Sequence, residues 1–193
     1  MDILRRLCMR KNFGPKTYMY PLPVLIIGTY GDDGTPDAMN AAWGGISDYN
    51  QVALCLSESH KTTRNILKRK AFTVSMADAV HVAECDYVGM VSGNDVKDKF
   101  AKAGFHATKS EFVDAPVIDE LPMTLECRLV KVNEDGLIIG EIVNVSAEES
   151  ILGADGKIDP AKFTPITFDP VNNVYLKLGE ACGKAFGEGK KIK

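Results

Sequence analysis

The side chains best suited to ligand chemistry follow an apolar stretch at 52–56 and open an expected helix over 61–70. The first turn of a helix carries partial positive charge and unpaired N–H groups, so acidic side chains are normally favoured there. Basic side chains at that position are explained if an anion such as a phosphate binds to the turn. The alternative is a solvated basic face capped by Ser59 or Thr62. The candidates in and beside this turn are His60, Lys61, Thr62, Thr63 and Arg64.

A second candidate stretch, 40–45, reads Asn-Ala-Ala-Trp-Gly-Gly. Its small side chains would let a flat ring approach the backbone, whose N–H and C=O groups can recognise the polar edge of that ring. Asn40 could add a side-chain hydrogen bond, and Trp43 could pack against the ring or shield it. The alternative is a tight turn that holds a tryptophan of the core or of an interface.

A third stretch, 92–100, reads Ser-Gly-Asn-Asp-Val-Lys-Asp-Lys-Phe. Ser92 could cap the helix that follows, and Lys99 with Phe100 could face a ligand. The alternative is an ordinary capped helix with Phe100 in the core and Lys99 in water.

Other chemistries find little support in the sequence. No Ser/His/Asp or Cys/His arrangement indicates hydrolysis, and a pair such as His81 and Cys85 is more often incidental than catalytic. The three histidines lack metal-ligand spacing with another His or Cys, so we expect no metal site. We therefore assign no residue a catalytic or metal-binding role.

Composition limits the class of protein. The chain has 193 residues, a net charge of −3, a sequence pI of about 5.7 and 45% hydrophobic residues, which suits one domain and argues against nucleic acid as the main partner. No apolar run approaches the length of a membrane span, and residues 1–16 lack the apolar stretch of a signal peptide. Scattered cysteines without a C-x-x-C pair are typical of reduced thiols, so we expect a cytoplasmic protein. They are Cys8, Cys55, Cys85, Cys127 and Cys182.

The apolar periodicity predicts about seven strands, mostly joined by hairpins, with helices inserted over 61–70, 78–91 and 95–104. Strands that follow one another, instead of alternating with helices, favour an antiparallel sheet or barrel. The sequence contains neither the Rossmann nor the P-loop glycine motif, so a nucleotide would be held in another manner. The expected strands are 24–29, 37–42, 52–56, 72–76, 124–132, 137–145 and 173–178.

One strand changes the phase of its alternation. Apolar residues alternate through Leu125, Cys127 and Leu129, and then continue at Val130 and Val132. A period-two pattern that shifts within a strand predicts a bulge or sharp bend, as barrels use to turn corners.

Six stretches of the chain have an informative order and spacing: 21–29, 40–43, 60–66, 86–93 with 98–100, 122–128 and 175–180. Taken together, they resemble the flavin reductase-like family, whose fold is the FMN-binding split barrel, and specifically its flavoredoxin-type branch. The resemblance implies a mainly β fold with inserted helices, an antiparallel Greek-key split β-barrel. It covers nearly the whole chain from about residue 15, and we expect an N-terminal extension over 1–20, an FMN-binding domain over 21–180 and a loose tail over 181–193.

The resemblance further implies FMN bound non-covalently, at or near the interface of a homodimer. Residues 40–43, which are Asn40, Ala41, Ala42 and Trp43, would lie along the isoalloxazine ring. The phosphate and ribityl chain would be held by Ser57, His60, Lys61, Thr62 and Thr63. Lys99 would approach the flavin from an inserted helix. This branch often has Thr where Asn40 stands, so the potential of the flavin could differ here.

The function that follows is that of a flavoprotein oxidoreductase in which the cofactor performs the redox chemistry and the protein holds it. Electrons would pass between NAD(P)H or a protein donor and an acceptor. Two alternatives stay open at this stage. One is a non-catalytic FMN or heme-related binding protein on the same barrel, and the other is a structural or interaction barrel whose basic turn is solvated.

Overall fold

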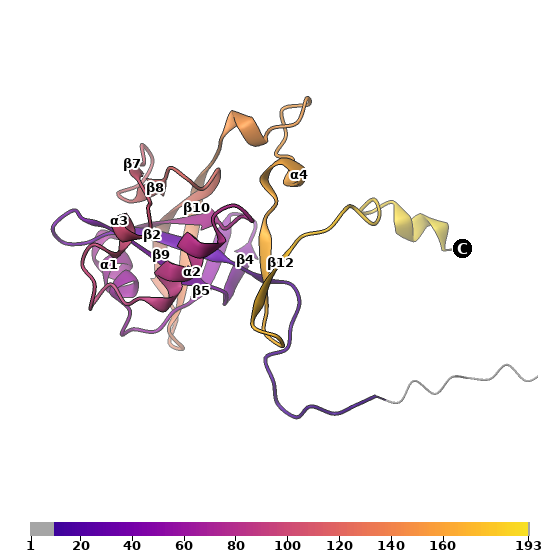
Figure 1. The fold of residues 1–193 in the computed structure, drawn as a ribbon, viewed down its shortest axis with the longest axis horizontal. Coiled ribbons are helices and arrows are strands. Elements are labelled where there is room, and N and C mark those ends of the chain that lie inside the picture. The colour runs from indigo at the N-terminus through magenta and orange to yellow at the C-terminus, as the bar shows by residue number, and fades with distance from the viewer. Residues whose placement is uncertain (1–9, 193) are drawn as a thin grey trace, which may run out of the picture.

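The computed structural model describes residues 10–192 of the chain. Residues 1–9 of the expected N-terminal extension lie outside this part, and Cys8 lies outside it with them. Segments near both ends of the described chain run away from the body of the molecule (Figure 1), and residues 10–21 are all exposed. No helix within residues 10–192 has the length and apolar character that a membrane crossing requires.

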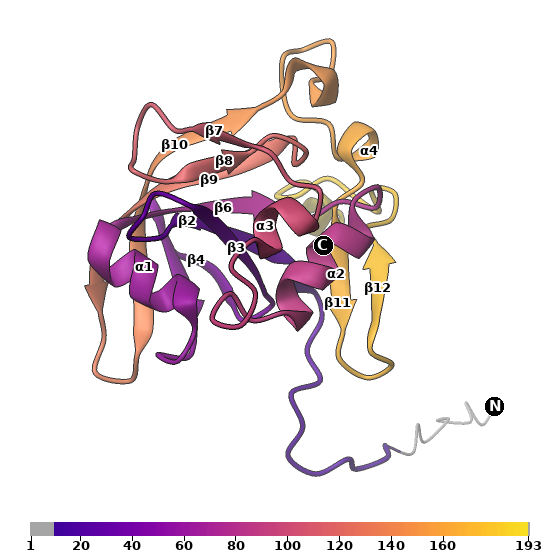
Figure 2. The same ribbon diagram turned by 60° about the vertical axis from the view of Figure 1, so that its left-hand side comes forward.

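A seven-stranded antiparallel sheet forms the body of the molecule and curls around its own inner face (Figure 2). Its strand order is β3-β2-β6-β9-β10-β5-β4, so β3 and β4 are the two edges. The expected mainly β, antiparallel architecture with inserted helices is confirmed. The strands are β2 (Leu25–Tyr30), β3 (Pro36–Ala41), β4 (Gly44–Asp48), β5 (Gln51–Cys55), β6 (Ala71–Met76), β9 (Met123–Val132) and β10 (Leu137–Ala147).

Two smaller sheets extend this body. The three-stranded one joins β1 (Leu22–Pro23), β11 (Ile166–Asp169) and β12 (Val174–Lys177), and the two-stranded one joins β7 (Ala107–Lys109) and β8 (Pro116–Ile118). Five of these twelve strands, β1, β4, β7, β8 and β11, were not expected from the sequence pattern.

The helices are shorter than their sequence patterns suggest. Helix α1 (Lys61–Arg69) lies at one end of the curled sheet, and α2 (Val82–Met90) and α3 (Lys99–Lys102) lie beside β3 (Figure 2). The helix expected over 95–104 is reduced to the four residues of α3, because 92–98 forms turns instead. The remaining helical turns are α4 (Pro160–Phe163), η1 (Glu149–Ile151) and η2 (Glu188–Lys191).

The expected bend in β9 is confirmed by the strand register. Ile139 pairs with Lys131 while the next residue, Gly140, pairs with Leu129, so Val130 is the extra residue of a bulge. The bulge lies where the apolar alternation changes phase. A residue inserted into one strand increases the local bend and twist, which helps the sheet to curl.

Two apolar cores lie on opposite faces of β2. Leu25 and Ile27 belong to the cluster enclosed by the curled sheet, and Ile26 belongs to the cluster between the sheet and α2. Each core contains a free cysteine, Cys127 in the first and Cys85 in the second. Burial raises the pKa of both thiols to about 12, so neither is a thiolate at neutral pH.

Candidate functional site

The first turn of α1 is open to an acceptor from outside the helix. Its N-cap residue, His60, has an extended backbone and makes no side-chain cap, and the turn contains no acidic residue. The alternative in which Ser59 or Thr62 caps this helix is therefore wrong. The hydroxyl of Thr62 donates instead to Asp37 Oδ2 at 3.0 Å, and that of Thr63 donates to the Ser57 carbonyl at 2.7 Å. The N–H groups of the turn are left for another partner.

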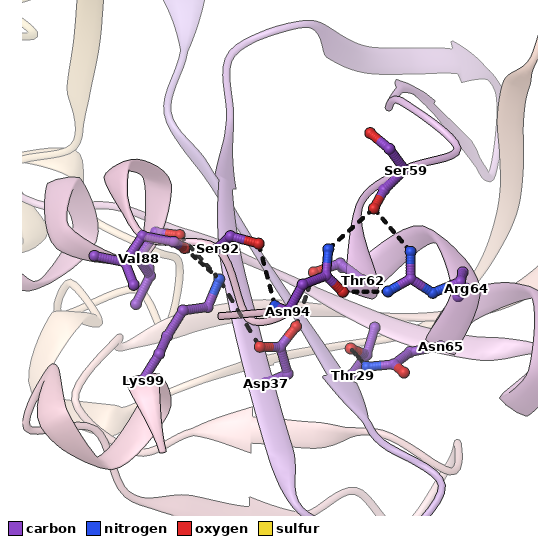
Figure 3. Close-up of polar contacts among 11 residues, drawn as sticks. Thr29, Asp37, Ser59, Thr62, Arg64, Asn65, Val88, Ser92, Asn94 and Lys99 are labelled. Carbon is purple, nitrogen blue, oxygen red and sulfur yellow. Dashed lines mark hydrogen bonds and ion pairs between the residues drawn. The ribbon is translucent and has the colours of Figure 1, made fainter. Parts of the chain in front are cut away.

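A buried carboxylate and a buried ammonium lie directly behind this turn (Figure 3). Asp37 and Lys99 have exposed fractions of 2% and 3%, and Lys99 Nζ lies 3.8 Å from Asp37 Oδ1. A charged group at this depth normally needs an ion pair or hydrogen bonds. Asp37 thus accepts a hydrogen bond from the Thr62 hydroxyl of α1 and pairs with the Lys99 ammonium of α3.

The Lys99 ammonium also caps the C-terminal end of α2. It donates to the carbonyls of Val88 and Val91 at 3.2 and 3.0 Å, which are among the last acceptors of that helix. Burial lowers the pKa of Lys99, and the carboxylate of Asp37 partly opposes that shift. The alternative that placed Lys99 in water is wrong, whereas Phe100 lies in the core as that alternative expected.

A cavity of about 150 Å³ separates the first turn of α1 from the loop after α2. His60, Lys61 and Thr62 line it on the helix side, and Ser92 and Gly93 line it on the loop side. Lys99, Met39 and residues 88–91 at the end of α2 form the rest of the wall. The structure therefore brings four of the predicted site residues, His60, Lys61, Thr62 and Lys99, around one small cavity that both polar and apolar side chains line.

Ser57 and Thr63 support this cavity from outside it. Thr63 is 3% exposed, and its side chain turns inward to the Ser57 carbonyl. The hydroxyl of Ser57 lies 2.8 Å from that of Ser59. Ser92 does not cap α3, since its hydroxyl accepts from the Asn94 N–H at 3.1 Å within the preceding turn.

A second, apolar groove of about 610 Å³ lies beyond the other end of β3. Ala42 and Trp43 line it together with Cys55 and residues 16–19. Trp43 is 56% exposed, so it is not a core residue. Cys55 was expected on an apolar strand, and the structure places its thiol at the exposed end of β5.

Asn40 and Ala41 do not line this groove. Asn40 Nδ2 lies 3.1 Å from the Cys85 carbonyl and 3.5 Å from the Tyr175 hydroxyl, so the amide donates within the chain and Oδ1 is its free acceptor. The hydroxyl of Tyr175 donates to Asp86 at 2.7 Å, which fixes the acceptor that Asn40 meets. Ala41 packs in the core inside the curled sheet. Of the four residues expected along a ring, the side chains of two line the groove.

Asp37 and Gly93 were missed by the sequence reasoning. Asp37 belongs to an expected strand. Nothing in its neighbours marks it as the partner of Thr62 and Lys99, which lie 25 and 62 positions further along the chain. Gly93 has no room for a side chain, because a Cβ there would lie 2.5 Å from Asp37 Oδ1 and 3.0 Å from Lys61 Cδ. A glycine between two polar stretches is a weak signal of such close approach.

Two other polar groups carry no sign of chemistry. His81 Nδ1 lies 3.0 Å from Asp78 Oδ1, and the nearby Cys85 thiol is buried with its raised pKa. Within residues 10–192, no three His, Cys, Asp or Glu side chains are arranged to hold a metal ion.

Comparison with known proteins gives one consistent result. A model of the flavin reductase like domain matches residues 17–170. Flavoredoxin of Desulfovibrio vulgaris (Miyazaki F) is 40% identical, with a TM-score of 0.90 over 94% of this chain and 100% of that chain. Flavoredoxin from Methanosarcina acetivorans is 28% identical, with a TM-score of 0.84 over 96% and 98%. An FMN-binding domain of a flavin reductases-like enzyme from Shewanella baltica, at 19% identity, has a TM-score of 0.74 over 84% and 88%, and shares the fold.

Proposed function

Because the chain belongs to the flavin reductase-like family, we propose that it binds FMN along β3 and carries reducing equivalents on that cofactor. One observation carries the proposal. The first turn of α1 offers uncapped N–H groups and Lys61 to a small cavity, in a turn that has no acidic residue. A terminal phosphate matches this cavity in charge, in hydrogen-bonding character and in size.

At the phosphate end, Lys61 and the N–H groups of the first turn make the direct contacts in our proposal. The Thr62 hydroxyl donates to Asp37, so the backbone N–H of Thr62 is its donor to the phosphate. His60 and Ser57 lie at the mouth of the same turn and can reach the phosphate or the ribityl chain. Thr63 and Lys99 hold the turn and the α2 end in place, since their donors are engaged within the chain.

At the ring end, we place the isoalloxazine beside Ala42 and Trp43. Asp37 and Ala42 are five residues apart, which corresponds to about 17 Å of extended strand and suits a ribityl chain followed by a ring. Because β3 is an edge of the sheet, its outer backbone groups have no strand partner there and can recognise the polar edge of the ring. Asn40 would contribute Oδ1 as an acceptor.

The bound FMN supplies the hydride or electron chemistry, and the chain binds it, orients it and limits its contact with water. No acid or base from the protein is required in this proposal. Electrons come from NAD(P)H or from a reduced redox protein. The FMN-binding domain is assigned to 21–180, with the extension over 1–20 and the tail over 181–193 flanking it.

We further propose that the chain acts as a homodimer. Large apolar side chains are exposed on and beside the edge strand β4: Ile46 is 69% exposed, and Trp43 is 56% exposed. An exposed edge strand with apolar side chains is normally covered. A second copy of the chain on this face would enclose the ring end of the FMN site.

The test is an absorption spectrum of the purified protein with added FMN, followed by anaerobic addition of NADH or NADPH. We expect the spectrum of the flavin to shift on binding and its visible bands to bleach with a nicotinamide or with a reduced protein donor. Bands that bleach only with a protein donor would identify an electron carrier. A protein that binds FMN but accepts electrons from no donor would contradict the redox function, and one that binds no FMN would contradict the whole proposal.

A further inference from the structure

A three-residue bridge lies on the outer side of the phosphate cavity. Arg64 donates to the Ser59 carbonyl at 2.8 Å and to the side-chain oxygen of Asn94, and Asn94 Nδ2 donates to the same Ser59 carbonyl at 3.2 Å (Figure 3). We call these three residues the Ser59–Arg64–Asn94 bridge. It fastens the loop after α2 to the turn before α1. While the bridge is intact, Arg64 is therefore engaged with the chain and is not a free cation for a ligand.

A larger groove of about 830 Å³ lies beside the phosphate cavity, and the bridge holds the loop that carries Gly93 against the turn before α1. Lys61 and Gly93 line both spaces, whereas Arg64 and Asn94 line only the outer groove. The two spaces therefore meet at Lys61 and Gly93. Gly93 packs so closely on Asp37 and Lys61 that a Cβ there would meet both of them, so the meeting point is already filled. As the structure stands, the phosphate cavity ends at this wall.

The outer groove has the chemistry to hold a second phosphate. Four basic side chains and three carboxylates line it, and Lys68 is engaged with Asp32 at 2.6 Å. Guanidinium and ammonium groups are the usual partners of phosphate oxygens in proteins. A ligand with two linked phosphates would need to reach these groups through the wall at Gly93. The basic side chains are Lys61, Arg64, Lys68 and Lys97.

We propose that the Ser59–Arg64–Asn94 bridge selects FMN over FAD, by making the phosphate cavity a closed end. This inference rests on the proposed FMN site. The terminal phosphate of FMN stops at the cavity, whereas FAD continues from that phosphate into a second phosphate and adenosine. Discrimination by steric exclusion needs no new attractive contact to FMN, only a wall against the longer ligand. Opening the bridge releases Arg64 and gives the adenosine monophosphate portion of FAD access to the outer groove.

The experiment measures the dissociation constants of FMN, FAD and riboflavin by fluorescence titration of the purified chain. We expect the unaltered protein to bind FMN about a hundredfold more tightly than FAD. Asn94→Ala removes the side chain that joins the loop to Arg64 and Ser59. We expect it to reduce the preference for FMN by about tenfold, through tighter FAD binding, while riboflavin affinity is unchanged.

Two further variants keep the test interpretable. Arg64→Lys retains the charge but loses the two-pronged contact, and it should shift the preference in the same direction as Asn94→Ala. Lys68→Ala alters the same groove without touching the bridge, so its FMN-to-FAD preference should equal that of the unaltered protein. Unaltered riboflavin affinity in each variant shows that the ring site has folded.

The outcomes separate this inference from the proposed function. If the unaltered protein binds FMN and FAD equally, or if Asn94→Ala and Arg64→Lys leave the preference unchanged, the bridge is not the selector and the FMN site stands. If the unaltered protein binds neither FMN nor riboflavin, the proposed function fails and this inference fails with it.

Discussion

At its Asp37 end, β3 adjoins side chains that are buried and hydrogen-bonded to one another, whereas beyond Ala41 the neighbouring side chains are apolar and exposed. Asp37 and Lys99 are at most 3% exposed, and Trp43 is 56% exposed. The first region is complete within one chain. The second is an open groove lined by residues of β4 and β5 and by residues 16–19. In the proposed FMN site, rigid recognition of the phosphate and looser packing on the ring therefore belong to opposite ends of one strand.

The largest expected effect is at the buried end. Asp37→Asn removes the carboxylate that faces Lys99 and leaves that cation buried without its partner, at a cost of about 3 kcal/mol in the free energy of unfolding. Urea denaturation measures the loss. Asp32→Asn, which breaks an exposed pair with Lys68, is the matched control and should cost less than about 1 kcal/mol.

A double variant sharpens this test. Asp37→Asn combined with Lys99→Met removes both charges and should recover a large part of the stability lost in Asp37→Asn alone. If Asp37→Asn and Asp32→Asn lower the free energy of unfolding equally, the buried pair stabilises the fold no more than a surface pair does.

A substitution at the exposed end of β3 should change ligand affinity and leave the free energy of unfolding nearly unchanged. Trp43→Ala removes the aromatic surface beside the proposed ring, and we expect FMN and riboflavin to bind about tenfold more weakly, with their ratio unchanged. Stability should change little because Trp43 is largely exposed. Val80→Ala, a change at a 78% exposed apolar residue outside the groove, serves as the control. A loss confined to FMN would assign Trp43 to the phosphate end instead.

Cysteine reactivity gives a smaller effect that reports on the same groove. Among the four cysteines within residues 10–192, Cys55 and Cys182 are exposed, whereas Cys85 and Cys127 are buried with raised pKa values. Of these four, iodoacetamide should therefore modify only Cys55 and Cys182 in the native protein. Added FMN should slow the modification of Cys55, which lines the groove, and leave Cys182 unaffected. Peptide mass spectrometry over time measures both rates. Equal protection of Cys55 and Cys182 would count against a ring in the groove.

The smallest effect comes from an exposed pair away from both ends of β3. His106 Nδ1 lies 2.6 Å from Glu120 Oε1, and this hydrogen bond raises the pKa of His106. The contribution to stability is full below the ordinary histidine pKa of about 6.5 and is lost as the pH rises through the raised value. His106→Gln should therefore flatten the pH dependence of unfolding in this range. An unchanged slope would mean that other groups produce it.

The parts of the fold that sequence reasoning predicted are those with a strong local pattern. The bulge at Val130 follows from a visible phase change, and α1 follows from its amphipathic run. Strand β4 was missed because it begins Gly-Gly, which is typical of a turn. It exists because its backbone pairs with β5, so the interaction that makes it a strand is not local.

The candidate site shows the same division. Cations on a helix start are visible in the sequence, and His60, Lys61 and Thr62 do meet at one cavity. The burial of Lys99 could not be predicted, because it depends on Asp37 and on the end of α2 arriving from separate elements. Ser92 has the side chain of a cap and makes the hydrogen bond of a turn, since both structures use the same local geometry.

The most direct test of the FMN site compares FMN and riboflavin, which differ only in the phosphate. We expect Lys61→Ala to weaken FMN binding by between about tenfold and a hundredfold, the range of a charge-assisted hydrogen bond of about 1.5–3 kcal/mol, and to leave riboflavin affinity unchanged. Lys68→Ala, in the last turn of the same helix, should alter neither. If Lys61→Ala leaves FMN affinity unchanged, or weakens riboflavin equally, then the phosphate does not bind at the first turn of α1.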